Sequence, residues 1–240
     1  MKKVAKEVID QINAGERESS NLMEFLAADF QKILQNTVPE FKFPEQALDV
    51  GITKKHKIIA ENLNTQFGFK IFDKLEGHKS DILRGLASYL IGEQDISFKE
   101  KLALSETLAN DSNSGVREWA WIAIRDDFSS NLEDNIKLVI PWTVSDKENI
   151  RRFASEMSRP RGVWCSHITK LREDPKIGLK ILEPLKSDPA KYVQLSVGNW
   201  LNDAGKDHPD WVIGLCAKWK KESATKETEK ICKRAMRSLQ

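Results

Sequence analysis

The sequence has few of the features that mark membrane, disulfide-bonded or low-complexity proteins. No apolar run approaches the roughly 20 residues that a membrane-spanning helix needs, so we expect no membrane partner. Glycine and proline number only 12 and 8 among 240 residues, which excludes collagen-like and low-complexity chains. The first ten residues mix charged and apolar side chains and lack the apolar stretch of a signal peptide. Three cysteines without a C-x-x-C spacing predict a reducing location, the bacterial cytoplasm or nucleoid.

The charges that are present are distributed unevenly. The whole chain carries 38 Lys and Arg against 36 Asp and Glu. Residues 151–240 hold 19 of these bases and 11 of the acids, a net charge of +8, and residues 1–150 have a net charge of −6. A basic half on a nearly neutral protein favours a surface that faces a polyanion. The simpler alternative is that lysine-rich helices only keep the chain in solution.

The hydrophobic pattern predicts an all-helical protein. Strand signals are scarce, and apolar residues recur at helical spacing along residues 21–34 and 81–90. The first of these stretches follows Ser20, and the second opens at Ser80 and Asp81. Residues 37–78 are less regular because prolines interrupt the pattern.

A paired-helix unit recurs in the later part of the chain. Each unit consists of an apolar helix, a polar turn with Asp or Ser, and a second helix. The second helices start near Val116, Ile150, Val193 and Ile231, which are 34, 43 and 38 residues apart. We expect the Asp or Ser of each turn to cap the second helix by accepting from its free N–H groups. A period near 40 is typical of HEAT-like helical-pair repeats.

These repeats predict a curved solenoid with a concave face lined by the second helices. We expect a single domain over residues 1–240, with less regular helices in 1–79 and recognisable repeats in 80–240. The alternative is an ordinary helical bundle whose spacing is accidental.

The helix from Val193 carries two different stripes. Val193, Val197, Trp200, Leu201 and Ala204 form the apolar one, which we expect to be buried. The opposite stripe places a carboxylate between an amide and an ammonium group; its members are Ser196, Asn199, Asp203 and Lys206. A solvated polar face is the alternative interpretation of this second stripe.

The helix from Ile150 ends in a loop rich in arginine. It displays Arg152 and Glu156 and stops at Pro160. Arg159, Arg161 and Trp164 therefore leave the same end of the helix. Two guanidinium groups beside an aromatic ring suit a phosphate backbone and an exposed sugar or base. The arginines could equally balance Glu156 while the Trp packs into the next repeat.

On the helix from Val116, Arg117, Trp121 and Arg125 share a stripe, which is compatible with DNA contact and equally with a cation–π stack between helices. The four histidines have no metal-ligand spacing, and no phosphate-binding or nucleophile motif occurs. We therefore predict no metal and no cofactor.

Two segments resemble AlkC-type DNA alkylation repair proteins, members of the AlkC/AlkD superfamily of HEAT-like-repeat DNA glycosylases. R-R-F-A-S-E-M-S-R-P-R-G-V-W (151–164) resembles that family's R-R-L-A-S-E-G-x-R-P-R-L-P-W. S-V-G-N-W-L-N-D-A-G-K-D-H-P (196–209) resembles its S-V-A-N-H-L-N-D-I-x-K-D-H-P. Two motifs in the correct order form a specific signal, and the repeat pattern extends the likeness over residues 80–240.

The resemblance implies a glycosylase that removes positively charged alkylated bases, of the N3-methyladenine type, from duplex DNA without flipping the base. It implies Asp203 as the principal catalytic carboxylate and Glu156 as its partner. Lesion contacts would come from Trp164, Trp121, Trp200 and Asn199. Contacts to the DNA backbone would come from Arg152, Arg159, Arg161, Lys206, Arg117 and Arg125. We expect a monomer whose partner is double-stranded DNA with alkylated bases.

The chain departs from the family pattern at a few positions. Trp121 stands where a third active-site carboxylate, a Glu, is expected. Gly162 and Val163 replace Leu-Pro before the loop Trp, and Trp200 stands where His is usual. Two other functions therefore stay open: a weak or inactive relative that binds distorted or branched DNA, and a HEAT-type scaffold for protein interaction.

Overall fold

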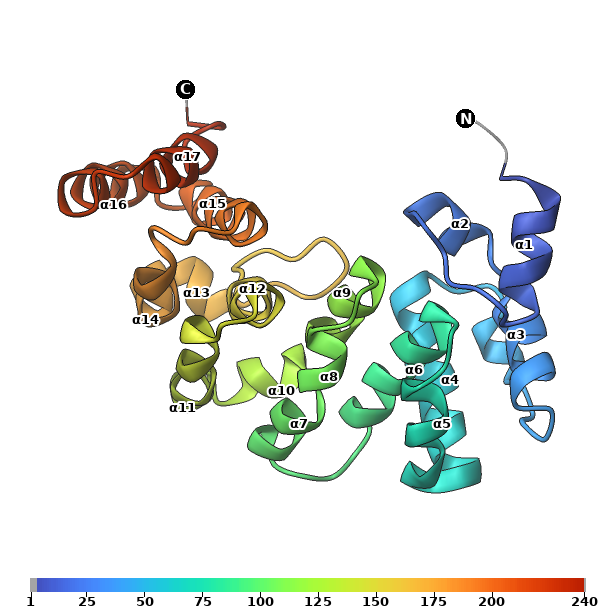
Figure 1. The fold of residues 1–240 in the computed structure, drawn as a ribbon. Helices are drawn as coiled ribbons and strands as arrows, with labels where there is room; N and C mark the ends of the chain where they lie inside the picture. Colours follow the sequence, from blue (N-terminus) through green and yellow to red (C-terminus); the bar gives the residue numbers. More distant parts are fainter. Residues whose placement is uncertain (1–3, 240) are drawn as a thin grey trace. The chain divides into compact units, whose positions relative to one another are not determined.

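The computed structural model describes residues 4–239 and divides into two compact units, Met1–Ile124 and Arg125–Gln240. Within the described residues every regular element is an α-helix or a short 3-10 helix (Figure 1), which confirms the predicted all-helical class. No helix among these residues is long and apolar enough to cross a membrane. Where we expected one domain, the boundary between the two units falls inside the repeat region.

The first unit contains the N-terminal helices and the first repeat helices. In chain order they are α1 (Lys6–Asn13), α2 (Leu22–Ala27), α3 (Phe30–Thr37), α4 (Ile52–Phe67), α5 (Phe72–Glu76), α6 (Asp81–Gly92), α7 (Phe98–Leu104), α8 (Glu106–Ala109) and α9 (Ser114–Ala123). Two 3-10 helices, Glu45–Ala47 and Gly68–Ile71, lie on either side of α4.

The second unit contains the remaining repeat helices. They are α10 (Arg125–Ser130), α11 (Leu132–Val139), α12 (Glu148–Met157), α13 (Thr169–Glu173), α14 (Leu179–Leu182), α15 (Lys191–Gly205), α16 (Pro209–Glu222) and α17 (Lys226–Ala235). Three 3-10 helices join them, at Ile140–Val144, Pro175–Gly178 and Glu183–Leu185. The second helices expected near Val116, Ile150, Val193 and Ile231 are α9, α12, α15 and α17.

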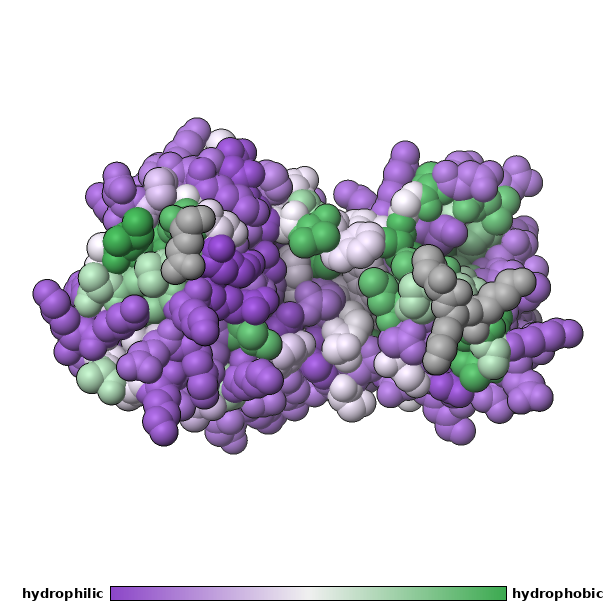
Figure 2. Space-filling view, turned by 90° about the horizontal axis from the view of Figure 1, so that it is seen from above, coloured by the Kyte–Doolittle hydropathy of each residue, from purple (hydrophilic) through white to green (hydrophobic). Residues whose placement is uncertain are grey.

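The apolar stretch 21–34 forms two helices instead of one. The chain turns after α2, and the Asp29 side chain starts α3 by accepting from the Lys32 N–H at 3.2 Å. This break leaves Leu22 and Leu26 of α2 exposed, at 56% and 49%, and Figure 2 shows hydrophobic residues reaching the surface of this unit. The rest of the expected stripe is buried: Phe25, Phe30, Ile33 and Leu34.

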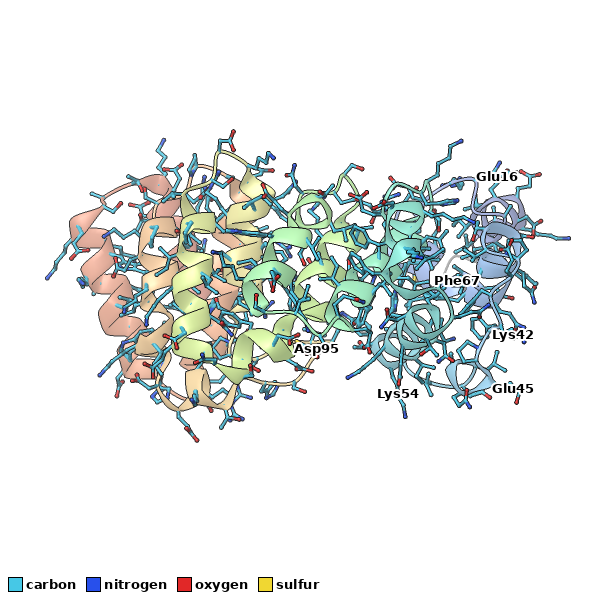
Figure 3. The ribbon with its side chains drawn as sticks, turned by 90° about the horizontal axis from the view of Figure 1, so that it is seen from below. Glu16, Lys42, Glu45, Lys54, Phe67 and Asp95 are labelled. Carbon is cyan, nitrogen blue, oxygen red and sulfur yellow. The ribbon has the colours of Figure 1, made fainter. Side chains whose placement is uncertain are left out.

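Residues 37–78, where the sequence showed no regular pattern, form α4 and the short helices before and after it. Lys42, Glu45 and Lys54 lie on the exposed periphery of the unit (Figure 3). Underneath, the imidazole of His56 packs against Phe30 and Trp119, with ring centroids 5.1 and 4.3 Å away. Burial lowers the pKa of His56 to about 4. The ring is therefore neutral near pH 7 and acts as a core residue of α4.

The turns that precede α6, α9, α12 and α15 share one hydrogen-bond pattern. In each, a side chain accepts the backbone N–H of the residue two positions later, at 2.7 to 3.2 Å; the acceptors are His78, Asp111, Ser145 and Asp188. That N–H belongs to the residue just before the helix. The expectation that Asp or Ser of the turn binds the free N–H groups of the helix is therefore wrong, because these side chains shape the turn itself.

A second contact accompanies each of these turns. Six residues after the acceptor, a long side chain donates to the carbonyls of the acceptor residue and of the next residue, at 2.6 to 3.2 Å; the donors are Arg84, Arg117, Arg151 and Gln194. Carbonyls in such turns have no helical partner, so the donor supplies bonds that the backbone cannot make. The first member, Arg84, shows that the repeat begins at α6, one unit earlier than the anchor residues indicated.

Two of these arginines also connect neighbouring turns. Arg84 binds Asp111 with two bonds, at 2.7 and 3.1 Å, and Arg151 binds Asp188 in the same way, at 2.6 and 3.0 Å. Only 12% of the Arg151 side chain and 3% of the Asp188 side chain are exposed. Each pair is therefore a nearly buried, bidentate contact from one repeat to the next.

We predict that Arg151→Ala lowers the free energy of unfolding of the second unit by about 3 kcal/mol or more, because it leaves Asp188 buried without its guanidinium partner. Chemical denaturation followed by circular dichroism measures this change. In the control Lys137→Ala, the broken pair with Asp134 is at the surface, with both side chains more than 60% exposed, so the midpoint should not move. Equal midpoints for both variants and the unmodified protein would contradict a structural role for Arg151.

Candidate active site

The candidate site lies where α12 and α15 pack against each other. The apolar stripe predicted on α15 is buried along its whole length, and Phe153 and Met157 of α12 are buried as well. Where the helices meet, the Ser196 hydroxyl donates to the Ser155 hydroxyl at 2.9 Å. Glu156 follows Ser155 directly, and Asp203 lies two helical turns after Ser196. The packing therefore fixes both helices that carry the candidate carboxylates.

Arg159 connects these two carboxylates. Its Nη1 donates to Glu156 Oε2 at 3.0 Å, and its Nε and Nη2 donate to Asp203 Oδ2 at 2.9 and 2.7 Å. The side chains of Glu156 and Asp203 are only 4% and 7% exposed, and that of Arg159 is 15% exposed. The structure thus brings together three residues that the sequence singled out, and places both carboxylates on one guanidinium group.

Two further cations lie beside the pair. Arg152 is 3.5 Å from Glu156 Oε1, and its guanidinium group lies over the ring of Tyr192, 4.2 Å from the centroid. Lys206 is 3.4 Å from Asp203 Oδ1, and its side chain is 49% exposed. Arg152 and Lys206 therefore flank the carboxylates at the oxygens that Arg159 does not occupy.

This arrangement keeps Glu156 ionised. Burial alone would raise its pKa, but the neighbouring guanidinium groups of Arg152 and Arg159 hold the pKa below its usual range. The carboxylates in turn raise the pKa of Arg159 against the opposing effect of its burial. Glu156 is therefore an anion near neutral pH, and such an anion can stabilise positive charge on a bound molecule.

Two residues that we expected at the DNA surface lie in the core of the unit instead. Trp200 is fully buried, and its indole N–H donates to the Ser158 carbonyl at 2.8 Å. Arg125 is 1% exposed. It donates to the carbonyls of Met157, Arg159 and Ser166, and so fixes the end of α12 and the loop after it. Burial accordingly lowers the pKa of Arg125.

The expected residues of α9 belong to the first unit. Trp121 is 4% exposed, and its indole N–H donates to Glu118 Oε2 at 3.0 Å. One guanidinium nitrogen of Arg117 donates to two backbone carbonyls in the turn before α9. The side chain at position 121 is therefore a buried aromatic ring, bonded to a carboxylate one helical turn earlier.

The loop after α12 carries the remaining predicted contacts. Arg161 pairs with Asp207, with two bonds of 2.7 and 2.9 Å, and Asp207 also binds Arg172 of α13 at 3.1 Å. Trp164 is 43% exposed, and the neighbouring Val163 is 78% exposed. The loop thus presents an arginine and an aromatic ring at the surface close in sequence to Arg159.

Sequence reasoning missed two arginines of the C-terminal segment. Arg234 of α17 donates to Asn199 Oδ1 at 2.8 Å, which engages the amide that we expected at a lesion. Arg237 is exposed at the surface. Partial burial of its guanidinium group is the largest cause of its lowered pKa, and the charges of Asp203 and Arg159 also act on it. The basic sequence K-R-A-M-R of residues 233–237 was the available signal. The described part of the chain holds no His, Cys, Asp and Glu cluster suited to a metal ion.

Similarity to known proteins defines the class of this fold. The structure resembles the DNA-bound alkylpurine DNA glycosylase AlkC of Pseudomonas fluorescens, with a TM-score of 0.69 and 23% identity over 97% of this chain and 62% of AlkC. It also resembles AlkD2 of Streptococcus mutans, with a TM-score of 0.64 and 20% identity over 88% of this chain and 99% of AlkD2. These likenesses establish a shared helical-repeat fold.

The sequence comparison establishes the family. Residues 86–228 match the model of the DNA alkylation repair enzymes, and the chain belongs to this family. A Bacillus subtilis relative, the uncharacterized protein YhaZ, is 38% identical over 117 residues, which are 49% of this chain and 32% of that protein. The chain thus spans less than two thirds of the length of YhaZ and of AlkC.

We predict that Arg125→Met lowers the free energy of unfolding by about 3 kcal/mol, because three carbonyl groups at the end of α12 and in the loop after it lose their donor, one of them in a buried contact. Chemical denaturation tests this value. If Arg125→Met keeps its stability and loses only affinity for DNA, the result would support the expected contact between Arg125 and a phosphate.

Proposed function

We propose that the chain is a DNA glycosylase that excises positively charged alkylated bases, of the N3-methyladenine type, from duplex DNA as a step of base excision repair. The observation that carries this proposal is the pair Glu156 and Asp203, two nearly buried carboxylates held on Arg159 in a member of the DNA alkylation repair enzymes. The activity of AlkC, an alkylpurine DNA glycosylase, supports the same reaction class.

The reaction needs an anion close to the sugar. When the bond between C1′ and the alkylated base breaks, its electron pair moves to the base, which leaves as a neutral molecule. Positive charge then develops on the deoxyribose, and water adds at C1′ and gives up a proton. A carboxylate beside the sugar stabilises this charge, as in the cleavage of other glycosidic bonds. We assign this role to Asp203 and a supporting role to Glu156.

The expected size of this effect follows from Coulomb's law. Two unit charges 4 Å apart interact by about 4 kcal/mol at an effective dielectric constant of 20. A difference of about 1.4 kcal/mol changes a rate tenfold, so a single carboxylate can supply up to about a thousandfold. The positive charge of Arg159 reduces this contribution, and we expect about a hundredfold from Asp203.

The proposal includes excision without base flipping. A cationic base is already a good leaving group, so a pocket that activates the base is not required for the chemistry. Catalysis can act on the sugar from a protein surface, with the half-exposed ring of Trp164 against the deoxyribose or base. Arg152, Arg161, Lys206 and the additional Arg237 would hold the phosphates of the duplex, which position the DNA without reading its sequence. We propose that the chain acts as a monomer.

We predict that Asp203→Asn lowers the single-turnover rate of base release about a hundredfold, and that Glu156→Gln has a smaller effect in the same direction. Release of free methylated bases from alkylated duplex DNA measures both rates. Affinity for DNA should be retained in Asp203→Asn, because the amide keeps the shape of the side chain. Asp134→Asn is the matched control, since this exposed carboxylate on α11 pairs with Lys137 on the same helix. Undiminished release by Asp203→Asn would contradict the assigned role.

We predict that Arg161→Ala weakens binding to damaged and undamaged duplexes by the same factor. Loss of one phosphate contact should also reduce the slope of log affinity against log salt concentration by about 1. Fluorescence anisotropy over a salt series measures both quantities. A loss confined to one base sequence would argue against a phosphate contact.

Trp121 favours a second candidate function, the binding of distorted or branched DNA without excision. The family pattern has a third carboxylate where this chain has a buried indole ring. Binding of alkylated DNA without release of any base by the unmodified protein would support this second function. Absence of both binding and release would instead leave a scaffold for protein interaction.

A further inference from the structure

Every side-chain nitrogen of Arg159 is engaged within this site. Its Nε, Nη1 and Nη2 atoms all donate to the two carboxylates, at 2.7 to 3.0 Å. A phosphate contact, the role that the sequence suggested, would compete with two acceptors that are themselves nearly buried. Moving the guanidinium group to a phosphate would leave both carboxylates without their main partner, which is costly for buried charges.

We propose that Arg159 is a positioning residue, whose guanidinium group bridges Glu156 and Asp203 and holds both as oriented anions for the reaction. This inference deepens the proposed glycosylase function and rests on it. It replaces the role of Arg159 as a DNA-backbone contact.

The geometry shows how the bridge orients Asp203. Both bonds from Arg159 end on Oδ2, whereas Oδ1 faces the partly exposed Lys206 at 3.4 Å. Two N–H donors that converge on Oδ2 hold this oxygen in place and leave Oδ1 outside the guanidinium contact. The backbone of Arg159 is fixed in turn, because its carbonyl accepts from Arg125 at 2.6 Å. Oδ1 is therefore the oxygen available to a developing positive charge.

The bridge also helps to keep Glu156 ionised. Glu156 faces Arg152 from its own helix, Arg159 from the loop and Ser196 from α15. Asp203 faces Arg159, Lys206 and the exposed Arg237 near the C-terminal end. Without Arg159, each carboxylate keeps a cation at the longer distance of 3.4 to 3.5 Å. Burial then acts on Glu156 with less opposing charge, so Glu156 holds its proton to a higher pH.

The first test needs no DNA. The carboxyl carbon resonance of Glu156, followed by NMR from pH 3 to 8, gives the apparent pKa of this side chain. In Arg159→Gln the loss of the positive charge should raise the pKa of Glu156 by about one pH unit or more. Arg159→Lys keeps a charge at this place and should stay close to the unmodified protein. Identical titrations of all three proteins would overturn the inference.

The second test is the pH dependence of base release in single turnover. The reaction needs the ionised carboxylates, so a raised pKa removes activity as the pH falls through it. In a profile measured from pH 4 to pH 8, Arg159→Gln should therefore lose its rate at a pH about one unit higher than the unmodified protein does. Its affinity for DNA and its salt dependence should be unchanged. The matched variant Arg161→Gln should show the opposite pattern, with weaker binding and an unshifted pH profile.

The outcomes separate this inference from the proposed function. A shifted carboxyl titration without base release by any variant would contradict the glycosylase and leave the positioning role standing. A loss of affinity and salt dependence in Arg159→Gln, with an unshifted pH profile, would overturn the positioning role. If Arg159→Gln does not fold, Arg159→Lys decides the question. It should bind DNA normally and release bases several-fold more slowly, and a normal rate with weakened binding would contradict the inference.

Discussion

The structure of the second unit depends on arginine side chains that bring donors to acceptors the helices leave unpaired. Helix ends and the turns between helices carry carbonyl groups without intrahelical partners. Arg151 serves the turn before α12, and Arg125 serves the end of the same helix. Both ends of α12 are therefore held by guanidinium groups. Because α12 and the loop after it carry Glu156 and Arg159, the accuracy of the candidate site depends on the same interactions.

Arginine performs different tasks in this unit, and burial distinguishes them. Arg125 lies inside the core and binds backbone carbonyls, while Arg159 lies at the edge and binds carboxylates. Arg161 is more exposed and pairs with Asp207 at the surface. A surface pair of this kind contributes little to stability and can exchange its partner for a phosphate. Within this region of the unit, Arg125 therefore stabilises the fold, Arg159 has the proposed positioning role, and Arg161 has the proposed contact to DNA.

The helices were predictable because apolar residues recur at helical spacing. The repeat was predictable because the paired-helix unit recurs at similar intervals along the sequence. The polar stripe of α15 and the motif around Glu156 singled out both carboxylates, and the family resemblance suggested their roles. The sequence offered Glu156 as a possible partner of the loop arginines, and Arg159 does pair with it. It did not indicate Asp203 or Asp207 as partners, since a helical position defines a face but not what covers it. Trp200 illustrates the limit: its spacing placed it correctly in the apolar stripe, whereas the family resemblance suggested a contact to the lesion. The six-residue interval from Asp111 to Arg117 recurs at Ser145 and Arg151. This interval was visible in the sequence, but a search for apolar periodicity does not detect it.

The proposed function requires a cationic base to approach a site in which cations outnumber anions. Around the pair, the cations Arg152, Arg159 and Lys206 outnumber Glu156 and Asp203. A free cationic base would gain little from such a surface. A duplex differs because its phosphates neutralise the exposed cations, Lys206 first among them. Arg159 has all its nitrogens committed to the carboxylates, so it is not drawn to the phosphates in the same way. Under the proposed function, binding of the backbone would therefore leave the carboxylates as the charges nearest the sugar, and the site would become favourable for positive charge only when DNA occupies it.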